Sequence, residues 1–203
     1  MTEKEIYIIR HGETAFNKMK IVQGSGVDSS LNEMGEWQAK RFFEHYKNEG
    51  FEKVIVSELK RTFETALPFI EAQIPYEKEG LIDEMNWGVY EGKAATEEMH
   101  KAYGELNKEW QAGNYDAKIE GGESANSLKD RLCKFIEKIK SIEERKILVV
   151  SHGRAMRCLM CILDKKEVKY MMQYPHSNTG LYKIELVKND FLIVRSNDTS
   201  HLK

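Results

Sequence analysis

Three short apolar runs predict buried β-strands. Ile6–Ile9, Val54–Val56 and Ile147–Val150 are rich in β-branched residues and do not alternate with polar positions, which is typical of strands covered on both faces of a sheet. Polar residues follow each run. We therefore expect three buried strands whose carboxyl ends carry polar side chains.

Apolar residues at helical spacing separate these runs. Asn32 is a suitable cap for a helix that reaches Gly50, and Ser124 caps a second amphipathic helix. Further helices are expected over 58–73, 94–112, 154–163 and 167–173. Residues 15–30, 82–92 and 114–122 are rich in Gly, Asn, Asp or Ser and are predicted to be irregular.

Strands that alternate with helices predict an α/β fold. We expect a three-layer α/β/α sandwich around a mainly parallel sheet, with one further extended segment at 76–81. Residues 181–187 and 191–195, joined by a Lys-Asn-Asp turn, predict an antiparallel hairpin at the edge. The chain contains no repeat and no linker, so residues 1–203 are predicted to form one domain.

Charge and composition narrow the possible functions. The chain has 203 residues, a net charge of -2 and a pI of about 6.3, so it lacks the basic field that a nucleic-acid-binding protein needs. No apolar run approaches the roughly 20 residues of a membrane span, and a strand begins too early for a signal peptide. The odd cysteine count is typical of a reducing compartment, and Cys158 and Cys161 lie in an apolar helical run, which favours buried thiols. We expect a cytoplasmic protein.

Two of the predicted strands end alike. Arg10-His11-Gly12 follows the first strand, Ser151-His152-Gly153 follows another, and Arg61 comes shortly after the strand at Val56. Because the carboxyl ends of parallel strands meet at one edge, these groups are expected to converge there. Guanidinium groups and glycine N–H groups suit a phosphoryl group. A neutral imidazole at such a site acts as a nucleophile, whereas a protonated one binds negative charge.

The strand ends belong to a larger set of short sequence motifs spread along the chain. They are Arg10-His11-Gly12-Glu13-Thr14, Asn17, Gln23-Gly24, Leu31-x-x-x-Gly35, Ser57-x-Leu59-x-Arg61-Thr62-x-x-Thr65-Ala66, Leu81-x-Asp83-Glu84-x-x-x-Gly88-x-x-Glu91-Gly92, Gly121-Gly122-Glu123-Ser124 and Ser151-His152-Gly153. This ordered set resembles the histidine phosphatase superfamily, the phosphoglycerate-mutase-like proteins, over nearly the full chain.

The resemblance implies roles for individual residues. His11 corresponds to the nucleophile that becomes a phosphohistidine, and Glu84 to the carboxyl group that protonates the leaving oxygen and later activates water. Arg10, Arg61 and His152 correspond to the cationic walls of a phosphate pocket, across which the two imidazoles are expected to face each other. Phosphate contacts are also implied for Asn17 and Gly153, and a late position, Asn178, is implied to orient the pocket. Asp83 and Glu91 are the alternative proton donors.

Several other residues receive weaker interpretations. Gln23, Gly24, Trp87 and Tyr90 are candidate substrate contacts, although aromatic residues more often pack in a core or at its rim. The sequence leaves open whether Arg154 faces solvent or substrate, and it leaves His176 undecided. His45, His100 and His201 are expected to be exposed. No metal and no cofactor is expected, because the histidines and carboxylates lack ligand spacing and the arginines already supply positive charge.

The resemblance leaves the phosphoryl acceptor open between water and a second hydroxyl. The cofactor-dependent mutases of this family carry a Glu-Arg-His-Tyr-Gly segment where this chain has Glu84-Met85-Asn86-Trp87-Gly88, and their Phe-x-Gly-Trp pattern is missing between residues 17 and 31. We therefore predict a phosphomonoesterase acting on a small phosphorylated metabolite, with specificity determined by residues 86–114. The alternatives are a cofactor-dependent phosphoglycerate mutase and a non-catalytic module that binds phosphorylated ligands. A monomer and a homodimer are equally compatible with the sequence.

Overall fold

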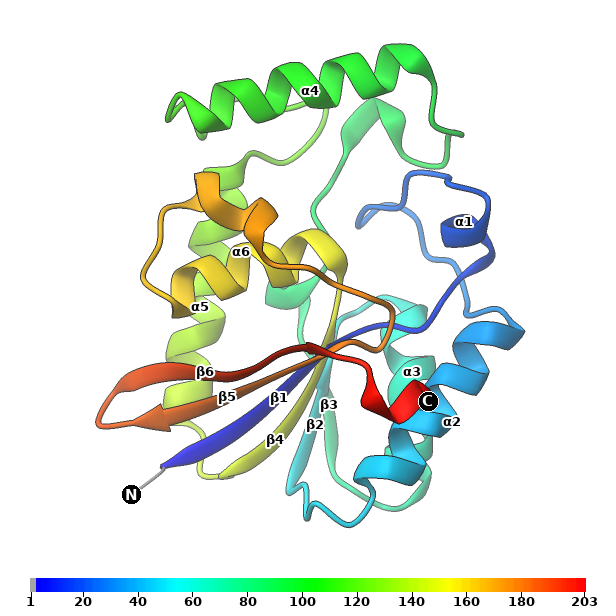
Figure 1. The fold of residues 1–203 in the computed structure, drawn as a ribbon, viewed down its shortest axis with the longest axis vertical. Coiled ribbons are helices and arrows are strands. Elements are labelled where there is room, and N and C mark those ends of the chain that lie inside the picture. Colours follow the sequence, from blue (N-terminus) through cyan, green and yellow to red (C-terminus); the bar gives the residue numbers. More distant parts are fainter. Residues whose placement is uncertain (1–2) are drawn as a thin grey trace.

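A six-stranded sheet forms the centre of the protein (Figure 1). The computed structural model describes residues 3–203. The strands are β1 (Lys4–Arg10), β2 (Lys53–Val56), β3 (Tyr76–Lys78), β4 (Lys146–Ser151), β5 (Leu181–Val187) and β6 (Asp190–Asp198), in the order β3-β2-β4-β1-β5-β6. The first four in that order are parallel, and β5 and β6 form an antiparallel hairpin at one edge. The predicted mainly parallel α/β fold with an edge hairpin is confirmed.

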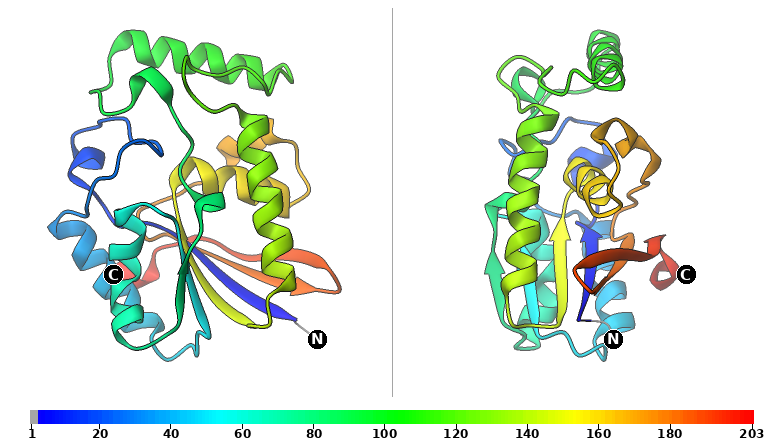
Figure 2. Two further views of the ribbon diagram at one scale, coloured as in Figure 1. Left: turned by 180° about the vertical axis from the view of Figure 1, so that it is seen from behind. Right: turned by 90° about the vertical axis from the view of Figure 1, so that its left-hand side faces the viewer.

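Alternating side chains of the strands build one apolar core on each face of the sheet. Ile6 and Ile8 of β1 pack with α5 (Ala125–Ser141) and α6 (Gly153–Leu163), whereas Tyr7 and Ile9 pack with α2 (Glu33–Tyr46) and α3 (Lys60–Glu71). All four β1 side chains are buried, as expected for an interior strand. Figure 2 shows helices on both sides of the sheet, which gives the predicted three layers.

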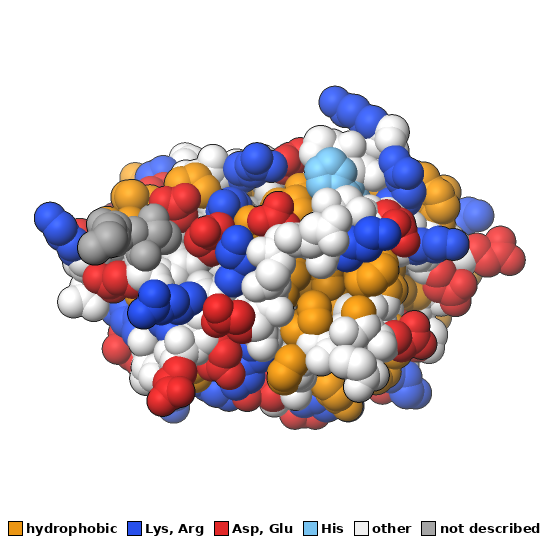
Figure 3. All heavy atoms as spheres, turned by 90° about the horizontal axis from the view of Figure 1, so that it is seen from below, with side chains coloured by type: hydrophobic (Ala, Val, Ile, Leu, Met, Phe, Trp, Pro, Cys, Tyr) orange, Lys and Arg blue, Asp and Glu red, His pale blue; other side chains and the backbone are white. Residues whose placement is uncertain are grey.

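The carboxyl ends of the parallel strands point toward α4 (Glu97–Gln111), which crosses one end of the molecule. Figure 2 shows the arrows of β1 and β4 pointing toward the end of the molecule that α4 covers. The opposite end carries interspersed basic and acidic side chains around an apolar area (Figure 3). Within the described part of the chain, no helix has the length and apolar character needed to cross a membrane.

The short helix expected over 167–173 is present as the 3-10 helix η3 (Val168–Gln173). Two local differences separate the structure from the sequence prediction. The segment 15–30 contains a short helix, α1 (Ala15–Lys18), which Thr14 and Asn17 stabilise through a reciprocal capping box. His201, expected to be exposed, is buried in the 3-10 helix η4 (Ser200–Leu202), because its ring packs against Phe42 and its Nε2 contacts the Thr179 hydroxyl.

The segment between β3 and α5 is tied down by a close backbone contact at Gly88. This residue begins the 3-10 helix η2 (Gly88–Tyr90), which follows η1 (Gly80–Ile82), and it has a positive φ of 56°. The Val89 N–H donates to the Glu120 carbonyl, and the Glu123 N–H donates to the Asn86 carbonyl. A Cβ at Gly88 would lie 2.0 Å from the Glu120 oxygen. Glycine is therefore required where this segment meets the start of α5.

We expect Gly88→Ala to lower the free energy of unfolding by roughly 2 kcal/mol or more, because a side chain there combines backbone strain with a backbone clash. The measurement is urea denaturation. Gly104→Ala is the matched control, since Gly104 lies inside α4 with nothing within 4 Å of its would-be Cβ. It is expected to be stabilising by about 0.5–1 kcal/mol. Equal effects of the two substitutions would contradict the strain argument.

Candidate active site

His11 stands at the end of β1, held as a continuation of the sheet. Its N–H donates to the Ser151 carbonyl at 3.0 Å, and the Asn178 amide donates to the His11 carbonyl at 2.9 Å. The ring Nδ1 lies 2.7 Å from the Gly12 carbonyl, which can only accept, so Nδ1 carries a proton. Burial, with the nearby charges of Arg10 and Arg61, holds the pKa of His11 well below its usual value. The ring is therefore neutral, with the Nε2 lone pair available.

His152 lies beside His11, but it does not carry the positive charge that was predicted for it. The two ring centroids are 5.2 Å apart, with the planes inclined by 57°. Arg61 Nε donates to His152 Nδ1 at 3.2 Å, and Nε2 lies 2.7 Å from the Ser57 hydroxyl. Burial and the charge of Arg61 lower the pKa of His152 well below its usual value. His152 is thus neutral in this structure, because a guanidinium donor already occupies one of its nitrogens.

The two predicted arginines take different positions. Arg10 Nη1 lies 3.2 Å from His176 Nδ1 and donates to the His176 carbonyl. Burial lowers the pKa of Arg10 to about 10, so it remains charged at neutral pH. Arg61 is fully buried and donates to the carbonyls of Gly24 and Val27 as well as to His152. Its fork therefore holds the loop of residues 22–28 in place.

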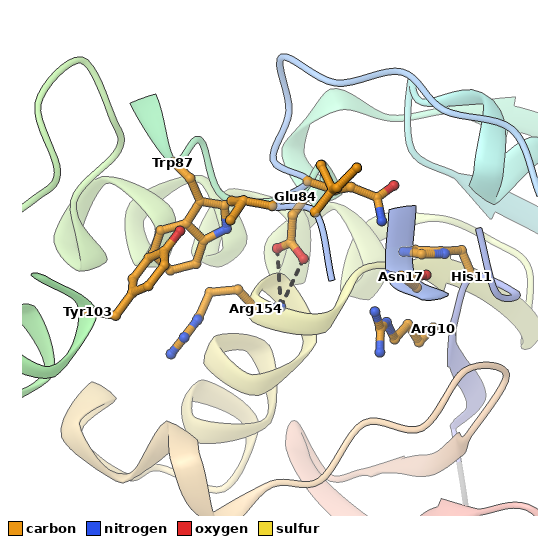
Figure 4. Close-up of a pocket in the computed structure, with 10 residues that line it drawn as sticks. Arg10, His11, Asn17, Glu84, Trp87, Tyr103 and Arg154 are labelled. Atoms are coloured by element: carbon orange, nitrogen blue, oxygen red, sulfur yellow. Dashed lines mark hydrogen bonds between the residues drawn. The ribbon is translucent and has the colours of Figure 1, made fainter. Parts of the chain in front are cut away.

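The Glu84 carboxylate lies at the start of α6, which the sequence did not predict. Both oxygens accept from the backbone N–H of Arg154 at 3.1 Å (Figure 4). One of them also accepts from the N–H groups of Ala155 at 3.1 Å and Met85 at 2.9 Å. The positive end of a helix stabilises a carboxylate in this position. Glu84 is buried, with 8% of its surface exposed. The helix that follows His152 therefore also positions the predicted acid.

The two alternative proton donors are engaged elsewhere. The Asp83 carboxylate accepts from the Glu58 N–H, and the Glu91 carboxylate accepts from the Trp87 N–H. Neither lines the cavity that contains His11. Of the three neighbouring carboxylates, the geometry favours Glu84 as the acid.

A cavity of about 260 Å³ opens at this site (Figure 4). Its lining contains six of the predicted residues, namely Arg10, His11, Asn17, Gln23, Glu84 and Trp87. Six others do not line it: Arg61, His152, Gly153, Gly24, Tyr90 and Asn178. Four lining residues were not predicted as site residues, namely Ile21, Val22, Tyr103 and Arg154. Tyr103 comes from α4, within the segment where specificity was expected but no residue could be singled out.

Asn17, which lines the cavity, lies next to Asn178, which binds the backbone of His11. The Asn17 Oδ1 accepts from the Thr14 N–H and lies 3.5 Å from the Asn178 amide nitrogen. This arrangement leaves the Asn17 amide nitrogen as a donor toward the cavity. Asn178 therefore supports the backbone of His11 and does not itself line the cavity.

Gly153 and His176 are packed against each other. A Cβ at Gly153 would lie 2.9 Å from a carbon of the His176 ring. Burial, followed by the charge of Arg10, lowers the pKa of His176 to about 3. His176, whose role the sequence left open, is thus a neutral hydrogen-bond partner of Arg10. Glycine is needed at position 153 because the His176 ring approaches it so closely.

We expect the protein to lose stability as the pH falls below about 6.5. His11, His152, His176 and His201 all have folded-state pKa values below the unfolded value near 6.5, with burial as the largest cause in each case. The unfolded chain therefore binds protons that the folded chain does not. As the pH falls from 6.5 toward its folded-state pKa, each such histidine lowers the free energy of unfolding by up to about 1.4 kcal/mol per pH unit.

His201 provides the test of this pH dependence, because burial lowers its pKa to about 4 and it lies outside the cavity. Urea denaturation at pH 7.5 and at pH 5.0 measures the loss in the free energy of unfolding between these two pH values. This loss should be roughly 1–2 kcal/mol smaller for His201→Gln than for the wild type. His100→Gln, on the exposed face of α4, is the matched control. The same loss in all three proteins would contradict the prediction.

Comparisons with known proteins point to one family. A model of the histidine phosphatase superfamily (branch 1) matches residues 6–199. Phosphoserine phosphatase 1 of Hydrogenobacter thermophilus is 30% identical over 200 residues, covering 98% of this chain and 94% of that protein. The probable phosphoglycerate mutase GpmB of Yersinia pestis is 28% identical over 205 residues, covering 98% and 94%. The structure of Bacillus stearothermophilus YhfR superposes with a TM-score of 0.86 at 25% identity, covering 98% and 100%. This chain therefore belongs to the histidine phosphatase superfamily, and the family resemblance of its sequence is confirmed.

Proposed function

We propose that the protein is a phosphomonoesterase that hydrolyses a small phosphorylated metabolite through a phosphohistidine on His11. The observation that carries this proposal is the state of the His11 ring. Its Nδ1 proton is engaged by the Gly12 carbonyl and its pKa is held low by burial, so a neutral Nε2 is available to the cavity. Neutral imidazole is the form that can attack phosphorus.

The surrounding groups suit the first half of the reaction. Arg10 and the Asn17 amide nitrogen bind the phosphoryl oxygens, and Arg61 adds positive charge from close by without lining the cavity. His11 Nε2 forms a bond to phosphorus as the bond to the ester oxygen breaks. Glu84 donates a proton to that oxygen, and the N–H groups of α6 stabilise the carboxylate that forms.

The second half reverses the role of Glu84. Its carboxylate accepts a proton from water, the water oxygen attacks phosphorus, and the bond to His11 Nε2 breaks to release inorganic phosphate. His152 and Arg61 act as positioning residues in this scheme, since they bond to each other and to the loop of residues 22–28. We also propose that the chain forms a single domain. A cytoplasmic location and a monomeric or homodimeric state are further predictions.

Trapping the covalent intermediate tests this function. The protein is mixed with p-nitrophenyl phosphate and quenched in base, and phosphorylation of His11 is located by mass spectrometry as an acid-labile group. Its absence, together with background p-nitrophenol release, would favour the non-catalytic binding module.

A mutase is the second candidate, because one relative that covers the chain is a probable phosphoglycerate mutase. Conversion of 3-phosphoglycerate to 2-phosphoglycerate, stimulated by a bisphosphate primer, would identify a hydroxyl rather than water as the acceptor. We expect release of inorganic phosphate without this conversion.

A further inference from the structure

Arg154 is the charged side chain of the cavity that the proposed reaction does not use. Its backbone N–H holds Glu84, but its guanidinium group lies apart, on the side of the cavity formed by Trp87 and Tyr103 (Figure 4). The sequence left open whether this residue faces solvent or substrate. The structure places it among the lining residues.

The guanidinium group of Arg154 is held by uncharged neighbours. Its Cζ lies 5.1 Å from the centre of the Trp87 ring and 5.6 Å from that of Trp110. Nη1 lies 3.3 Å from the Met171 sulfur and 3.4 Å from the Met172 sulfur. Aromatic faces attract the cation, and thioethers are only weak acceptors.

This environment holds the cation without neutralising it. Among residues 3–203, no carboxylate forms an ion pair with Arg154. Arg154 is partly exposed. Burial, followed by the like charge of Arg157 one turn along α6, lowers its pKa to about 10, while the Glu84 carboxylate acts in the opposite direction, so Arg154 is charged at neutral pH. Desolvated charges in proteins are normally paired. An anion at this position would complete the pairing.

The groups in the cavity also have a spatial order. In Figure 4, Arg10, His11 and Asn17 lie toward one end, Arg154 lies toward the other, and the Glu84 carboxylate lies between His11 and the Arg154 guanidinium. An ester whose phosphorus meets His11 and whose bridging oxygen meets Glu84 therefore extends its leaving portion toward Arg154. The planar fork of an arginine matches the two oxygens of a carboxylate or of a phosphate.

We propose that Arg154 is a specificity-determining residue that binds a second anionic group, a carboxylate or another phosphate, on the leaving portion of the substrate. The inference rests on the proposed phosphatase function and adds a substrate class to it. The preferred substrates are then phosphate monoesters with a second negative group. Trp87, Trp110 and the two methionines keep the guanidinium in place for this contact.

Matched substrate pairs test the inference. 3-Phosphoglycerate and glycerol 3-phosphate differ by a carboxylate in place of a hydroxymethyl group, and propane-1,3-diol bisphosphate and propyl phosphate differ by a second phosphate. We expect the wild type to prefer the more anionic member of at least one pair by 10-fold or more in kcat/KM, and the preferred pair identifies the anion. Arg154→Met should raise the KM for that ester by about 10- to 100-fold, as for loss of a hydrogen-bonded charge, while kcat changes less.

Control variants separate direct contact from general effects. Relative to the wild type, Arg154→Met should lose at least 10-fold more kcat/KM for the preferred ester than for p-nitrophenyl phosphate, which has no second anionic group, and Arg154→Lys should retain part of the preference because it keeps the charge without the fork. Arg157→Met removes an equal charge that does not line the cavity, and it should change the preference by less than about threefold.

The outcomes distinguish this inference from the function on which it rests. A wild type without any preference, or a preference that Arg154→Met retains, would overturn the role of Arg154 while hydrolysis of p-nitrophenyl phosphate still supports a phosphatase. If the wild type hydrolyses no ester, the proposed function fails, and calorimetric binding of the same pairs to wild type and Arg154→Met decides the role of Arg154. Thermal denaturation of each variant establishes that it is folded.

Discussion

Substituting His11 by asparagine is expected to lower kcat/KM for p-nitrophenyl phosphate by about 10⁴-fold or more and to abolish the covalent intermediate, because no other side chain replaces the attacking nitrogen. Asparagine is chosen because its amide nitrogen can still donate to the Gly12 carbonyl, as Nδ1 of the ring does. The local backbone is therefore retained while the nucleophile is lost. Steady-state hydrolysis and mass spectrometry of the quenched enzyme provide the two measurements.

Two further histidine variants sharpen this test. His45→Asn, on the exposed face of α2, should leave activity unchanged. His152→Asn should lower activity by less than His11→Asn and should still form the phosphoenzyme, since His152 positions Arg61 and lies outside the cavity lining. Phosphorylation that persists in His11→Asn, or moves to His152, would contradict the assignment of the nucleophile.

The fold and six of the ten cavity-lining residues could be predicted because they depend on local patterns. The apolar runs of β1 and β4 are continuous, so their burial is readable from sequence, and a parallel sheet then brings the polar ends together. Arg10 is the last residue of β1 and His11 directly follows it, so their position depends on few other contacts. Asn17 is similarly constrained by its capping contacts with Thr14.

The remaining features depend on contacts between distant segments. Arg61 is separated from the cavity because it bonds to carbonyls in the loop of residues 22–28, and the same residue makes His152 neutral by donating to its ring. No local pattern encodes either contact. His201 is polar and near the end of the chain, which favours exposure, yet it packs on Phe42. Tyr103 reaches the cavity only because α4 crosses the molecule above it (Figure 1).

Arg154 and Glu84 illustrate how one helix start serves two purposes. The first N–H groups of α6 have no partners within the helix, and two of them donate to the Glu84 carboxylate instead. The side chain of Arg154 is at the same time directed to the aromatic side of the cavity. The proposed acid and the proposed specificity residue are therefore coupled through one backbone position, and a shift of α6 would affect both.

Glu84→Gln is expected to separate the two halves of the reaction. For an alkyl phosphate such as glycerol 3-phosphate, kcat/KM should fall by about 10²- to 10⁴-fold, because the alkoxide leaving group requires a proton. For p-nitrophenyl phosphate, kcat/KM should change little, since p-nitrophenolate leaves without protonation. Water must still be activated in the second step, so the phosphoenzyme should accumulate. Rapid-quench measurements should show a burst of about one p-nitrophenol per active site followed by slow turnover.

The neighbouring acids provide the controls for this prediction. Asp83→Asn and Glu91→Gln keep an acceptor oxygen for the Glu58 and Trp87 N–H groups, so both variants should fold and retain kcat/KM within about threefold for either ester. A larger loss for glycerol 3-phosphate in one of these variants than in Glu84→Gln would transfer the proton-donor role to that residue. Equal losses for both esters in Glu84→Gln, without a burst, would instead indicate that Glu84 holds α6 in place and moves no proton. The dependence on the leaving group thus distinguishes a proton donor from a structural carboxylate that forms the same hydrogen bonds.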